Sequence, residues 1–348
     1  MNHDKLLTIA IPTYNRSAQL ELLLDSIAKQ YDSVKKHLRL VVVNNASTDN
    51  TEACCLKWKE QIDDLHYVAN IENVGAVANV IKCFKLAATE YCWIIGDDDV
   101  VRYDVLGKII ALLIDCKPNL IYMLGIPFND KPILEKMTFS EDLRIRHINA
   151  LDFCRIVNIH TTFISSVIFN KSKFLDGRGV DECGLITDTL FPQLNWVLKI
   201  ISSNEELLYI PQPLIQARAG NSGGYNLYKT FTIDLDNMVR HGLTPKMVGV
   251  YMGRVVLGYL PWLIMGVRRN EVGDFNVQLY ERHYFRKIYW RYPLYWLIVE
   301  PILYFPLSVA LFFLKLAYHL NRIQNLIYAV HVRFKIWAKS VASTRNGN

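Results

Sequence analysis

The first 125 residues of the chain alternate short β-type apolar runs with segments in which apolar residues recur at helical spacing. This alternation predicts βαβ units around a mostly parallel sheet flanked by helices, which is an α/β fold. We expect the strands at residues 6–11, 38–43, 65–68, 92–95 and 120–124.

Three helices are expected between the first four strands. The first follows Ser17, a favourable N-cap residue, and the second follows Asp49, with Glu52 placed to complete a capping box. The third covers residues 77–88, where apolar residues occupy one helical face directly after Gly75.

The rest of the chain is less regular. Residues 126–225 contain five prolines and a polar, glycine-rich loop at 219–224, and we interpret them as the second half of the same unit. From about residue 230 the pattern is helical again, with an apolar stretch that prolines break into short pieces. Only 14 uncharged residues separate Glu300 from Lys315, fewer than the ~20 of a spanning helix, which favours an interfacial or re-entrant hairpin.

Charge divides the chain unequally. Residues 268–348 carry 12 Lys and Arg against 4 Asp and Glu, a net of +8, whereas residues 1–267 have a net charge of −2. In the basic region the cations alternate with aromatic and aliphatic residues, a combination that suits an anionic membrane surface better than nucleic acid. We therefore expect deletion of residues 289–348 to leave a soluble catalytic domain; the alternative is that the aromatic residues form a packed helical lid.

Composition excludes several classes of protein. With 51% hydrophobic and 21% charged residues the chain is expected to fold, and no repeat is present. Seven cysteines without a C-x-x-C pair argue against a disulfide framework or a zinc site, so we expect reduced thiols. Residues 1–12 contain only a six-residue apolar stretch, at 6–11, that includes Thr8, which predicts a strand rather than a signal segment.

Polar residues follow four of the predicted strands, where ligands of open α/β sheets bind. The most prominent group is Asp97-Asp98-Asp99. In extended backbone, Asp97 and Asp99 would point one way and Asp98 the other, so two carboxylates would converge and favour a hard divalent cation. A solvated turn that caps the next helix is the alternative. Neither a G-x-G-x-x-G nor a P-loop sequence is present.

Four motifs in order carry a family resemblance: Pro12-Thr13-Tyr14-Asn15-Arg16, Asn44-Asn45-Ala46-Ser47-Thr48-Asp49, Asn73-Val74-Gly75 and Gly96-Asp97-Asp98-Asp99. As a set they resemble the family-2 nucleotide-sugar glycosyltransferases of the GT-A fold, and among these the bacterial O-antigen sugar transferases of the abequosyltransferase kind. The likeness covers residues 5–105 closely and extends to about residue 225. It implies an NDP-sugar donor, a divalent metal (Mg²⁺ or Mn²⁺) and a hydroxyl acceptor.

The resemblance also implies a division of the chain. Residues 1–228 would form the GT-A catalytic domain, with a nucleotide-binding half at 1–125 and an acceptor half at 126–228. Residues 229–348 would form a helical, apolar and basic region that associates with a membrane.

Carried over residue by residue, the resemblance places most of the nucleotide site at the strand ends. The expected nucleotide-binding residues are Pro12, Tyr14, Arg16, Asn44, Asn45, Asn73, Asp97 and Asp98, with Asp97 facing the ribose. Asp99 would bind the metal. Asn44 departs from the family pattern, which usually has Asp, and an amide can pair with cytosine or uracil, so the base stays open. A turn or helix-entry role is the alternative for Asn44 and Asn45.

Sugar transfer to a hydroxyl calls for a base, and Asp188 lies 89 residues after Asp99, a separation like that of the family. Asp181 and Glu182 are rivals, and Asp188 could instead cap the helix that follows it. Arg218, with Asn221 and Ser222 in the glycine-rich loop, could contact the diphosphate, and a plain surface loop is equally compatible. His160 is expected to be a hydrogen-bonded residue of the diphosphate or acceptor pocket rather than a metal ligand.

The resulting prediction is a metal-dependent glycosyltransferase at the cytoplasmic face of the inner membrane, peripheral or monotopic. Its expected partners are a CDP-, UDP- or GDP-sugar, a lipid-linked saccharide and the membrane surface, and not nucleic acid. A sugar nucleotidyltransferase is one alternative, although the glycine-rich N-terminal loop it needs is missing. A catalytically inactive, membrane-bound scaffold that binds nucleotide sugars is the other.

Overall fold

The computed structural model describes residues 5–203, 205–220, 225–271 and 282–345, with side chains up to residue 330. The chain divides into two compact units. The first comprises residues 1–223 and 233–250, and the second comprises residues 224–232 and 251–348. The predicted domain boundary at residue 228 falls inside residues 224–232, a short segment that belongs to the second unit.

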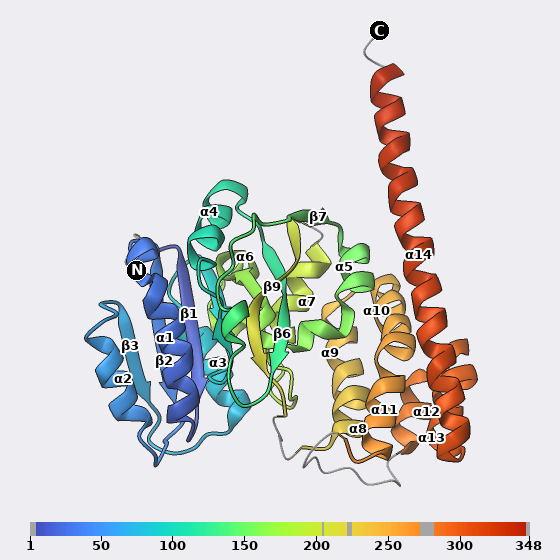
Figure 1. Cartoon of the computed structure of the whole chain (residues 1–348), viewed down its shortest axis with the longest axis horizontal. Coiled ribbons are helices and arrows are strands. Elements are labelled where there is room, and N and C mark those ends of the chain that lie inside the picture. Colours follow the sequence, from blue (N-terminus) through green and yellow to red (C-terminus); the bar gives the residue numbers. More distant parts are fainter. Residues whose placement is uncertain (1–4, 204, 221–224, 272–281, 346–348) are drawn as a thin grey trace. The chain divides into compact units, whose positions relative to one another are not determined.

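The first unit is built on a nine-stranded sheet with the order β3-β2-β1-β4-β8-β6-β9-β5, in which β7 also pairs with β9 (Figure 1). Its first strands are β1 (Leu7–Thr13), β2 (Leu38–Asn44), β3 (Leu65–Ala69) and β4 (Tyr91–Ile94). These four strands are all parallel, as the sequence predicts.

The remaining strands make the sheet mixed rather than mostly parallel. They are β5 (Val100–Val101), β6 (Leu120–Phe128), β7 (Arg146–Ile148), β8 (Val167–Asn170) and β9 (Leu207–Arg218). Strand β8 runs antiparallel to both of its neighbours, β4 and β6, whereas β6 and β9 are parallel. Strand β9 was not expected, because Pro211 and Pro213 interrupt it; the register of β6 against β9 shifts beside Pro213.

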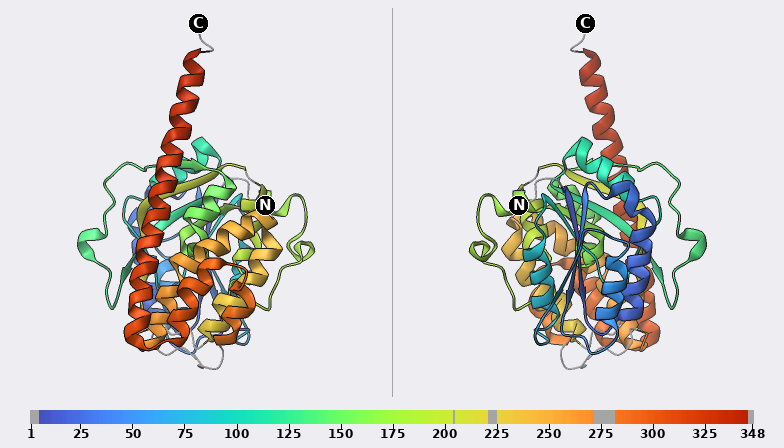
Figure 2. Two further views of the ribbon diagram at one scale, coloured as in Figure 1. Left: turned by 90° about the vertical axis from the view of Figure 1, so that its right-hand side faces the viewer. Right: turned by 90° about the vertical axis from the view of Figure 1, so that its left-hand side faces the viewer.

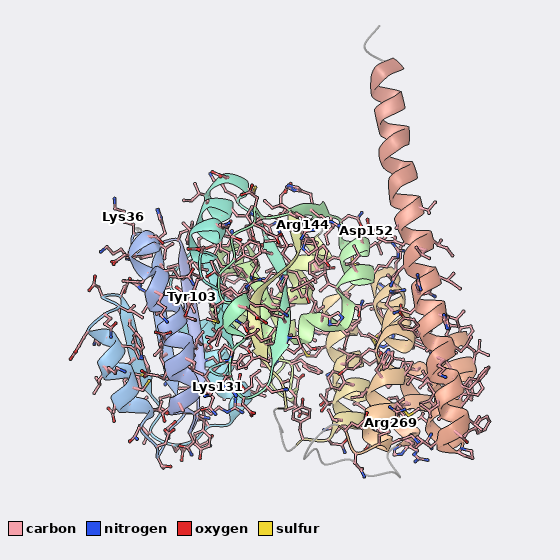
Figure 3. All side chains as sticks on the ribbon, viewed as in Figure 1. Lys36, Tyr103, Lys131, Arg144, Asp152 and Arg269 are labelled. Atoms are coloured by element: carbon pink, nitrogen blue, oxygen red, sulfur yellow. The ribbon has the colours of Figure 1, made fainter. Side chains whose placement is uncertain are left out.

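Two layers of helices cover the sheet. Helices α1 (Ser17–Val34), α2 (Thr51–Lys59) and α4 (Leu106–Cys116) pack together on one face, visible edge-on in Figure 2. The other layer contains α3 (Ala76–Leu86), α6 (Lys171–Leu175) and α7 (Leu194–Ser203). There the ring of Phe84 in α3 stacks on Trp196 in α7 at 4.5 Å and meets Phe174 in α6 edge-on at 5.6 Å. Figure 3 shows side chains filling the space between the sheet and these helices.

Two helix starts differ from expectation. Helix α1 begins at Ser17 with Arg16 as its N-cap, and α2 begins at Thr51 with Asn50 as its N-cap. The Asp49 carboxylate instead accepts hydrogen bonds from the backbone N–H groups of Ser17 (2.9 Å) and Thr51 (3.0 Å). Asp49 therefore ties the starts of both helices together, and the predicted capping box is wrong.

Shorter helices complete the first unit. They are η1 (Leu134–Lys136), α5 (Ala150–Ile156), η2 (Asn158–Thr162), η3 (Ile164–Ser166), η4 (Val180–Cys183) and α9 (Leu235–Gly242). Helix α9 packs on α7 so closely that a Cβ on Gly242 would lie 2.5 Å from Cβ of Leu198.

The second unit is helical. It holds α8 (Leu227–Lys229), most of α10 (Pro245–Gly258), α11 (Leu260–Arg268), α12 (His283–Tyr289), η7 (Tyr295–Val299), α13 (Glu300–Tyr304) and α14 (Leu307–Arg345). The π-helical turn η5 (Thr230–Asp234) lies at the boundary between the units. The Tyr289 hydroxyl donates to the Phe231 carbonyl at 2.9 Å, and the Arg254 guanidinium donates to Gln324 and Asn325 at 2.6 Å each.

Some aromatic residues of the basic C-terminal region are buried, and others are exposed. Tyr289 and Tyr295 are fully buried in the second unit. The exposed ones include Trp290 (52%), Trp296 (46%) and Phe312 (63%). Deleting residues 289–348 would therefore remove core residues of this unit, so the expected soluble fragment stays a prediction, and point substitutions on the surface are the better test.

One stretch, Pro245–Arg268, is long and apolar enough to span a membrane, and 56% of its most apolar window is buried within the protein. Helices in the cores of soluble proteins have the same length and composition, so this feature alone assigns no membrane span. A shorter apolar helical segment, Tyr295–Tyr304, overlaps the beginning of the uncharged stretch between Glu300 and Lys315, for which the sequence favours a hairpin.

Candidate active site

The loops after β1 and β2 are held together at the carboxyl edge of the sheet. The backbone N–H of Asn45 donates to the Thr13 carbonyl at 2.9 Å. The side-chain oxygen of Asn15 accepts from the backbone N–H of Thr48 at 2.7 Å, and the backbone N–H of Asn15 donates to the Ser47 hydroxyl at 2.8 Å. Asn15 has a positive φ of 52°, a conformation that Asn tolerates better than most residues. The two predicted nucleotide-contacting loops therefore form one surface.

The three aspartates after β4 form a buried cluster. Asp97, Asp98 and Asp99 are only 4, 6 and 3% exposed. Residues 97 and 98 lie in a turn, closed by a hydrogen bond from the backbone N–H of Asp99 to the Gly96 carbonyl at 3.1 Å. Because the backbone turns, the predicted alternation of side chains is wrong, and so is the alternative of a solvated turn.

Arg16 neutralises part of this cluster from the loop after β1. Its Nη1 lies 3.1 Å from Oδ1 of Asp97 and 2.9 Å from Oδ2 of Asp98. Two of the three carboxylates thus share one guanidinium nitrogen, in the pairing that Arg also makes with phosphate. The predicted nucleotide residues Arg16, Asp97 and Asp98 are in direct contact.

Asp99 is held by a different set of partners. The Ser165 hydroxyl donates to its Oδ2 at 2.6 Å, and the backbone N–H of Arg218 donates to its Oδ1 at 3.0 Å. The Gly96 N–H in turn donates to the Ser165 hydroxyl at 2.9 Å. Segments far apart in the sequence, at the start of β8 and the end of β9, therefore fix the orientation of the Asp99 carboxylate.

Burial and mutual repulsion change the acidity of the cluster. Burial, partly offset by Arg16, raises the pKa of Asp97 to about 6. Burial and the Asp98 charge raise the pKa of Asp99 to about 7. Without a further cation, ionising all three carboxylates is unfavourable, so the cluster has a residual affinity for positive charge.

Whether the cluster suits a divalent cation depends on its donors. Within the described ranges, no group of three or more His, Cys, Asp or Glu side chains is arranged as a metal site on its own. However, a Cβ built on Gly96 would lie 3.2 Å from Oδ1 of Asp98 and 3.3 Å from Oδ2 of Asp99, so these oxygens converge on one small space. Two hard oxygen donors fit a cation such as Mg²⁺ or Mn²⁺ that completes its shell with substrate phosphates.

The asparagines after β2 and β3 form a network of their own. The Asn44 side chain, 3% exposed, donates to the Tyr67 hydroxyl at 2.8 Å and accepts from the Ser47 N–H at 2.9 Å. Asn45 donates to the Asn73 side chain at 2.7 Å. The turn-forming alternative therefore describes much of what Asn44 does, while one N–H and one lone pair of its amide stay uncommitted.

Tyr14 and Pro12 lie beside these loops. Tyr14 is 43% exposed and Pro12 is partly buried at the end of β1. An exposed aromatic ring next to Arg16 is compatible with stacking on a base, and the role of both residues stays a prediction.

Asp188 lies in an exposed loop before α7. Helix α7 begins at Leu194, so Asp188 is not its N-cap. The neighbouring Thr187 lines a cavity of about 740 Å³ together with Val74 and Gly75, next to the Asn73 motif. Asp188 is thus close in sequence to a residue beside the strand-end loops, and its catalytic role stays a prediction.

The rivals of Asp188 have structural partners. Asp181 pairs with Lys85 at 2.6 Å, and the Glu182 carboxylate accepts from the Gly179 N–H at 2.9 Å.

The remaining candidate residues lie at different distances from the aspartate cluster along the fold. Arg218 ends β9 beside Asp99, and its guanidinium donates to the Asn129 carbonyl at 3.0 Å and lies over the Phe128 ring at 4.9 Å. His160 is exposed in η2, five residues before Ser165. Asn221 and Ser222 lie outside the described residues.

Several residues of the site were not found from the sequence. Ser165 orients Asp99, Tyr67 holds Asn44, and Asn79 donates to the Val43 carbonyl at 2.9 Å beneath the asparagine network. Only the tertiary structure brings these residues to the strand ends, and no local motif marks them. Polar residues on otherwise apolar elements, such as Asn79 in α3, were the one available signal.

A mixed α/β sheet with polar loops at its carboxyl edge and an acidic cluster after β4 agrees with the GT-A fold that the sequence predicts. Comparison with known proteins agrees. Residues 8–166 match glycosyl transferase family 2, so the chain carries a family-2 glycosyltransferase domain and is a glycosyltransferase.

One curated relative is the abequosyltransferase RfbV of Salmonella typhimurium. It is 27% identical over 230 residues, which cover 62% of this chain and 67% of the relative. This match covers more residues than the family-2 segment and confirms the predicted resemblance to O-antigen sugar transferases.

Two solved structures share the fold. TarS of S. aureus (residues 1–349, in complex with UDP-GlcNAc) has a TM-score of 0.60 at 14% identity, covering 92% of both chains. The mannosyltransferase PcManGT of Pyrobaculum calidifontis, in complex with GDP-Man and Mn²⁺, has a TM-score of 0.52 at 17% identity, covering 92% of this chain and 88% of that one. The fold prediction is confirmed.

Proposed function

We propose that the protein transfers one sugar from an NDP-sugar to a hydroxyl of a lipid-linked saccharide during synthesis of a bacterial surface polysaccharide such as O-antigen. The observation that carries the proposal is the buried aspartate cluster, held by Arg16, Ser165 and Arg218 at the ligand-binding edge of a family-2 domain. The abequosyltransferase relative and the nucleotide-sugar complexes of two proteins of the same fold support the donor class.

In this proposal the donor nucleotide lies across the loops after β1, β2 and β4. Tyr14, Asn44 and the asparagine network around Asn45 would meet the base, and Asp97 would meet the ribose. Arg16 bonds Asp97 and Asp98, so it lies beside the carboxylates where the ribose, the cation and the diphosphate are proposed to bind. Its guanidinium can then exchange a carboxylate for a phosphate oxygen.

A divalent cation, Mg²⁺ or Mn²⁺, would bind at Asp99, with Asp98 as the second oxygen donor. Bound there, it would supply positive charge to the leaving diphosphate. Ser165 and the Arg218 N–H keep the Asp99 carboxylate in place for that task. The pKa of about 7 at Asp99 fits a carboxylate that is fully ionised only when a cation is present.

Asp188 is the proposed general base. It would accept the proton of the acceptor hydroxyl, which enters through the cavity lined by Val74, Gly75 and Thr187. Its exposure suits a base that must reach a large saccharide, and Asp181 and Glu182 are already committed to Lys85 and Gly179.

Membrane association completes the proposal. The second unit exposes large apolar side chains along η7, α13 and α14, among them Leu297, Tyr304, Phe305, Phe312 and Leu326. Basic residues occur on α14 (Lys315 and Arg322) and on α12 (Arg286 and Lys287), and this mixture of apolar and basic residues suits the headgroup region of anionic bilayers. A peripheral or monotopic position at the cytoplasmic face of the inner membrane gives access to both a soluble donor and a lipid-linked acceptor.

The test is a panel of CDP-, UDP- and GDP-sugars incubated with the protein and Mn²⁺, with release of the nucleoside diphosphate as readout. We expect one donor to be hydrolysed slowly alone, and faster when membranes containing the lipid-linked acceptor are added. Nucleotide-sugar binding without turnover of any donor, with or without acceptor, would instead favour the inactive scaffold.

A further inference from the structure

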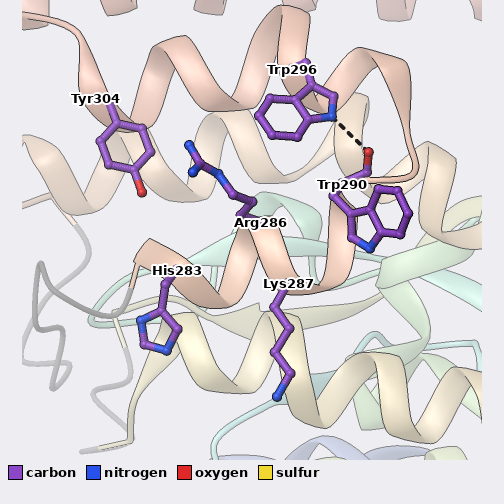
Figure 4. Close-up of a pocket in the computed structure, with 6 residues that line it drawn as sticks. All are labelled: His283, Arg286, Lys287, Trp290, Trp296 and Tyr304. Carbon is purple, nitrogen blue, oxygen red and sulfur yellow. Dashed lines mark hydrogen bonds between the residues drawn. The ribbon is translucent and has the colours of Figure 1, made fainter.

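A basic and aromatic pocket lies within the second unit, apart from the strand-end site (Figure 4). Its volume is about 530 Å³, and its lining consists of His283, Arg286, Lys287, Trp290, Trp296 and Tyr304. The pocket is formed entirely by residues 283–304, so it belongs to one compact unit.

The spacing of its residues explains why the pocket forms. His283, Arg286, Lys287 and Trp290 recur at three- and four-residue intervals and so share one face of α12 and its end. Trp296 belongs to η7 and closes one side, where its indole N–H donates to the Trp290 carbonyl at 2.8 Å (Figure 4). Tyr304, the last residue of α13, closes the other side.

The cations of the pocket are positioned by its aromatic walls. The Arg286 guanidinium lies over the Trp296 ring at 5.4 Å and pairs with Glu300. Arg282, just outside, lies over the Tyr304 ring at 5.6 Å. Glu300 is the only acidic residue among residues 282–330, against six Lys and Arg, so the pocket keeps an excess of positive charge. This charge favours an anionic ligand.

The rim of the pocket is apolar. Trp290, Trp296 and Tyr304 are each about half exposed, and the adjoining Leu297 and Phe305 are 51 and 47% exposed. A ligand that satisfies both features carries an anion and an apolar tail on the same molecule. Free phosphate would leave the apolar rim uncovered, and a neutral lipid would leave the cations unpaired.

We infer that this pocket binds the phosphate headgroup of a membrane lipid. The Arg286 guanidinium, which extends between the Tyr304 and Trp296 rings (Figure 4), would hold the phosphate oxygens, while the acyl or prenyl chain lies along the exposed aromatic rim. The inference deepens the proposed membrane association, on which it rests, by assigning a saturable lipid site to named residues.

The experiment uses monomeric lipid, so that adsorption to a bilayer does not contribute. The full-length protein is titrated with dihexanoyl phosphatidylglycerol below its micelle concentration, and binding is followed by calorimetry. We expect saturable one-to-one binding. Arg286→Gln should weaken it at least about tenfold, since the charge-assisted hydrogen bonds to the phosphate are lost. Arg322→Gln, which removes the same exposed charge from α14 outside the pocket, should change it less than about twofold.

Two further ligands identify the source of the phosphate. Farnesyl diphosphate stands for a prenyl-linked carrier: tighter binding than phosphatidylglycerol assigns the pocket to the lipid-linked acceptor, and weaker binding assigns it to bulk phospholipid. Both outcomes support a lipid phosphate site. Inorganic phosphate that binds as tightly as the lipids would overturn it, because the apolar rim would then contribute nothing.

The inference and the proposed membrane association can fail separately. A protein that floats with anionic liposomes but binds no monomeric lipid, or that binds it equally well after Arg286→Gln, has a membrane-binding surface without this site. A protein that does not float has lost the membrane proposal itself.

Discussion

The two compact units treat polar and apolar side chains in opposite ways. At the strand ends of the first unit, carboxylates and amides are buried and hydrogen-bonded, as at Asp99 and Asn44. In the second unit, large apolar side chains such as Leu297 and Phe312 are exposed instead. Buried polar groups are expensive unless they are paired, and exposed apolar groups are an aggregation risk unless they are covered. Each departure marks where a ligand is expected: a nucleotide sugar in the first unit and a bilayer in the second.

The largest expected effect is at Asp99. Asp99→Asn keeps the size of the side chain and one acceptor for Ser165 but removes the charge that would hold a divalent cation. Sugar transfer should fall by about 10³-fold, since a metal contributes several kcal/mol of charge stabilisation. The measurement is the initial rate of transfer at saturating donor and Mn²⁺.

Removing the metal from the wild type is the companion experiment. EDTA in excess should reduce transfer to the level of Asp99→Asn, and Mn²⁺ should restore the wild type only. A variant or a chelated enzyme with full activity ends the metal proposal. Asp99→Ala is a poorer choice, because it would leave the Ser165 hydroxyl and the Arg218 N–H without their acceptor.

Asp188→Asn is expected to have the next largest effect. The amide keeps the shape and removes the basicity, so turnover should fall by at least about 10²-fold while donor binding stays within about twofold. Asp181→Asn is the matched control, because Asp181 is also exposed, and its loss costs only a surface ion pair with Lys85. An inactive Asp181→Asn beside an active Asp188→Asn would move the base upstream.

The difference between the units also explains what the sequence could and could not predict. Strands β1 to β4 and helix α3 were found because each is a local run with clear periodicity, bounded by turn residues. Strand β9 was not found, since it contains Pro211 and Pro213 and its parallel pairing with β6 is set by contacts far apart in the chain.

The same contrast holds for the site. Arg16 and the three aspartates stand in recognisable motifs, whereas Ser165 and Tyr67 have no local signal and reach the site only through the sheet. The predicted orientation of the aspartate side chains was also wrong, because side chains alternate only along extended backbone, and residues 97 and 98 form a turn.

A third prediction concerns the stability of the first unit without metal. The folded pKa of Asp97 is about 6, above its usual 3.8, so between these values the folded state binds more protons than the unfolded state. Stability therefore falls as the pH rises from about 4 to 7, and ionising Asp97 alone contributes a loss on the order of 3 kcal/mol. The free energy of unfolding, measured in EDTA by denaturant titration, should be larger at pH 5 than at pH 8.

Asp97→Asn tests the cause, since it removes the titrating group and should flatten the dependence. The carboxylates with lowered pKa, such as Asp49 and Asp64, act in the opposite direction, but their stabilisation is lost only at more acidic pH. Stability that rises from pH 5 to pH 8 in EDTA would contradict the burial of the cluster.

The smallest expected effect compares the two surfaces directly. Leu297 in η7 and Leu56 in α2 are 51 and 53% exposed, so replacing each by Ser removes the same side chain from a similar setting. If only the second unit meets the bilayer, Leu297→Ser should weaken binding to phosphatidylglycerol vesicles by about fivefold. The reason is that the variant loses the apolar area that part of the leucine side chain buries in the bilayer interface. Leu56→Ser should change it less than about twofold. High salt should release the wild type only partly, because salt screens the basic residues but not the apolar contact. Equal effects of the two substitutions would mean that exposed leucines on either unit contribute alike, and the second unit would then lose its distinct role at the membrane.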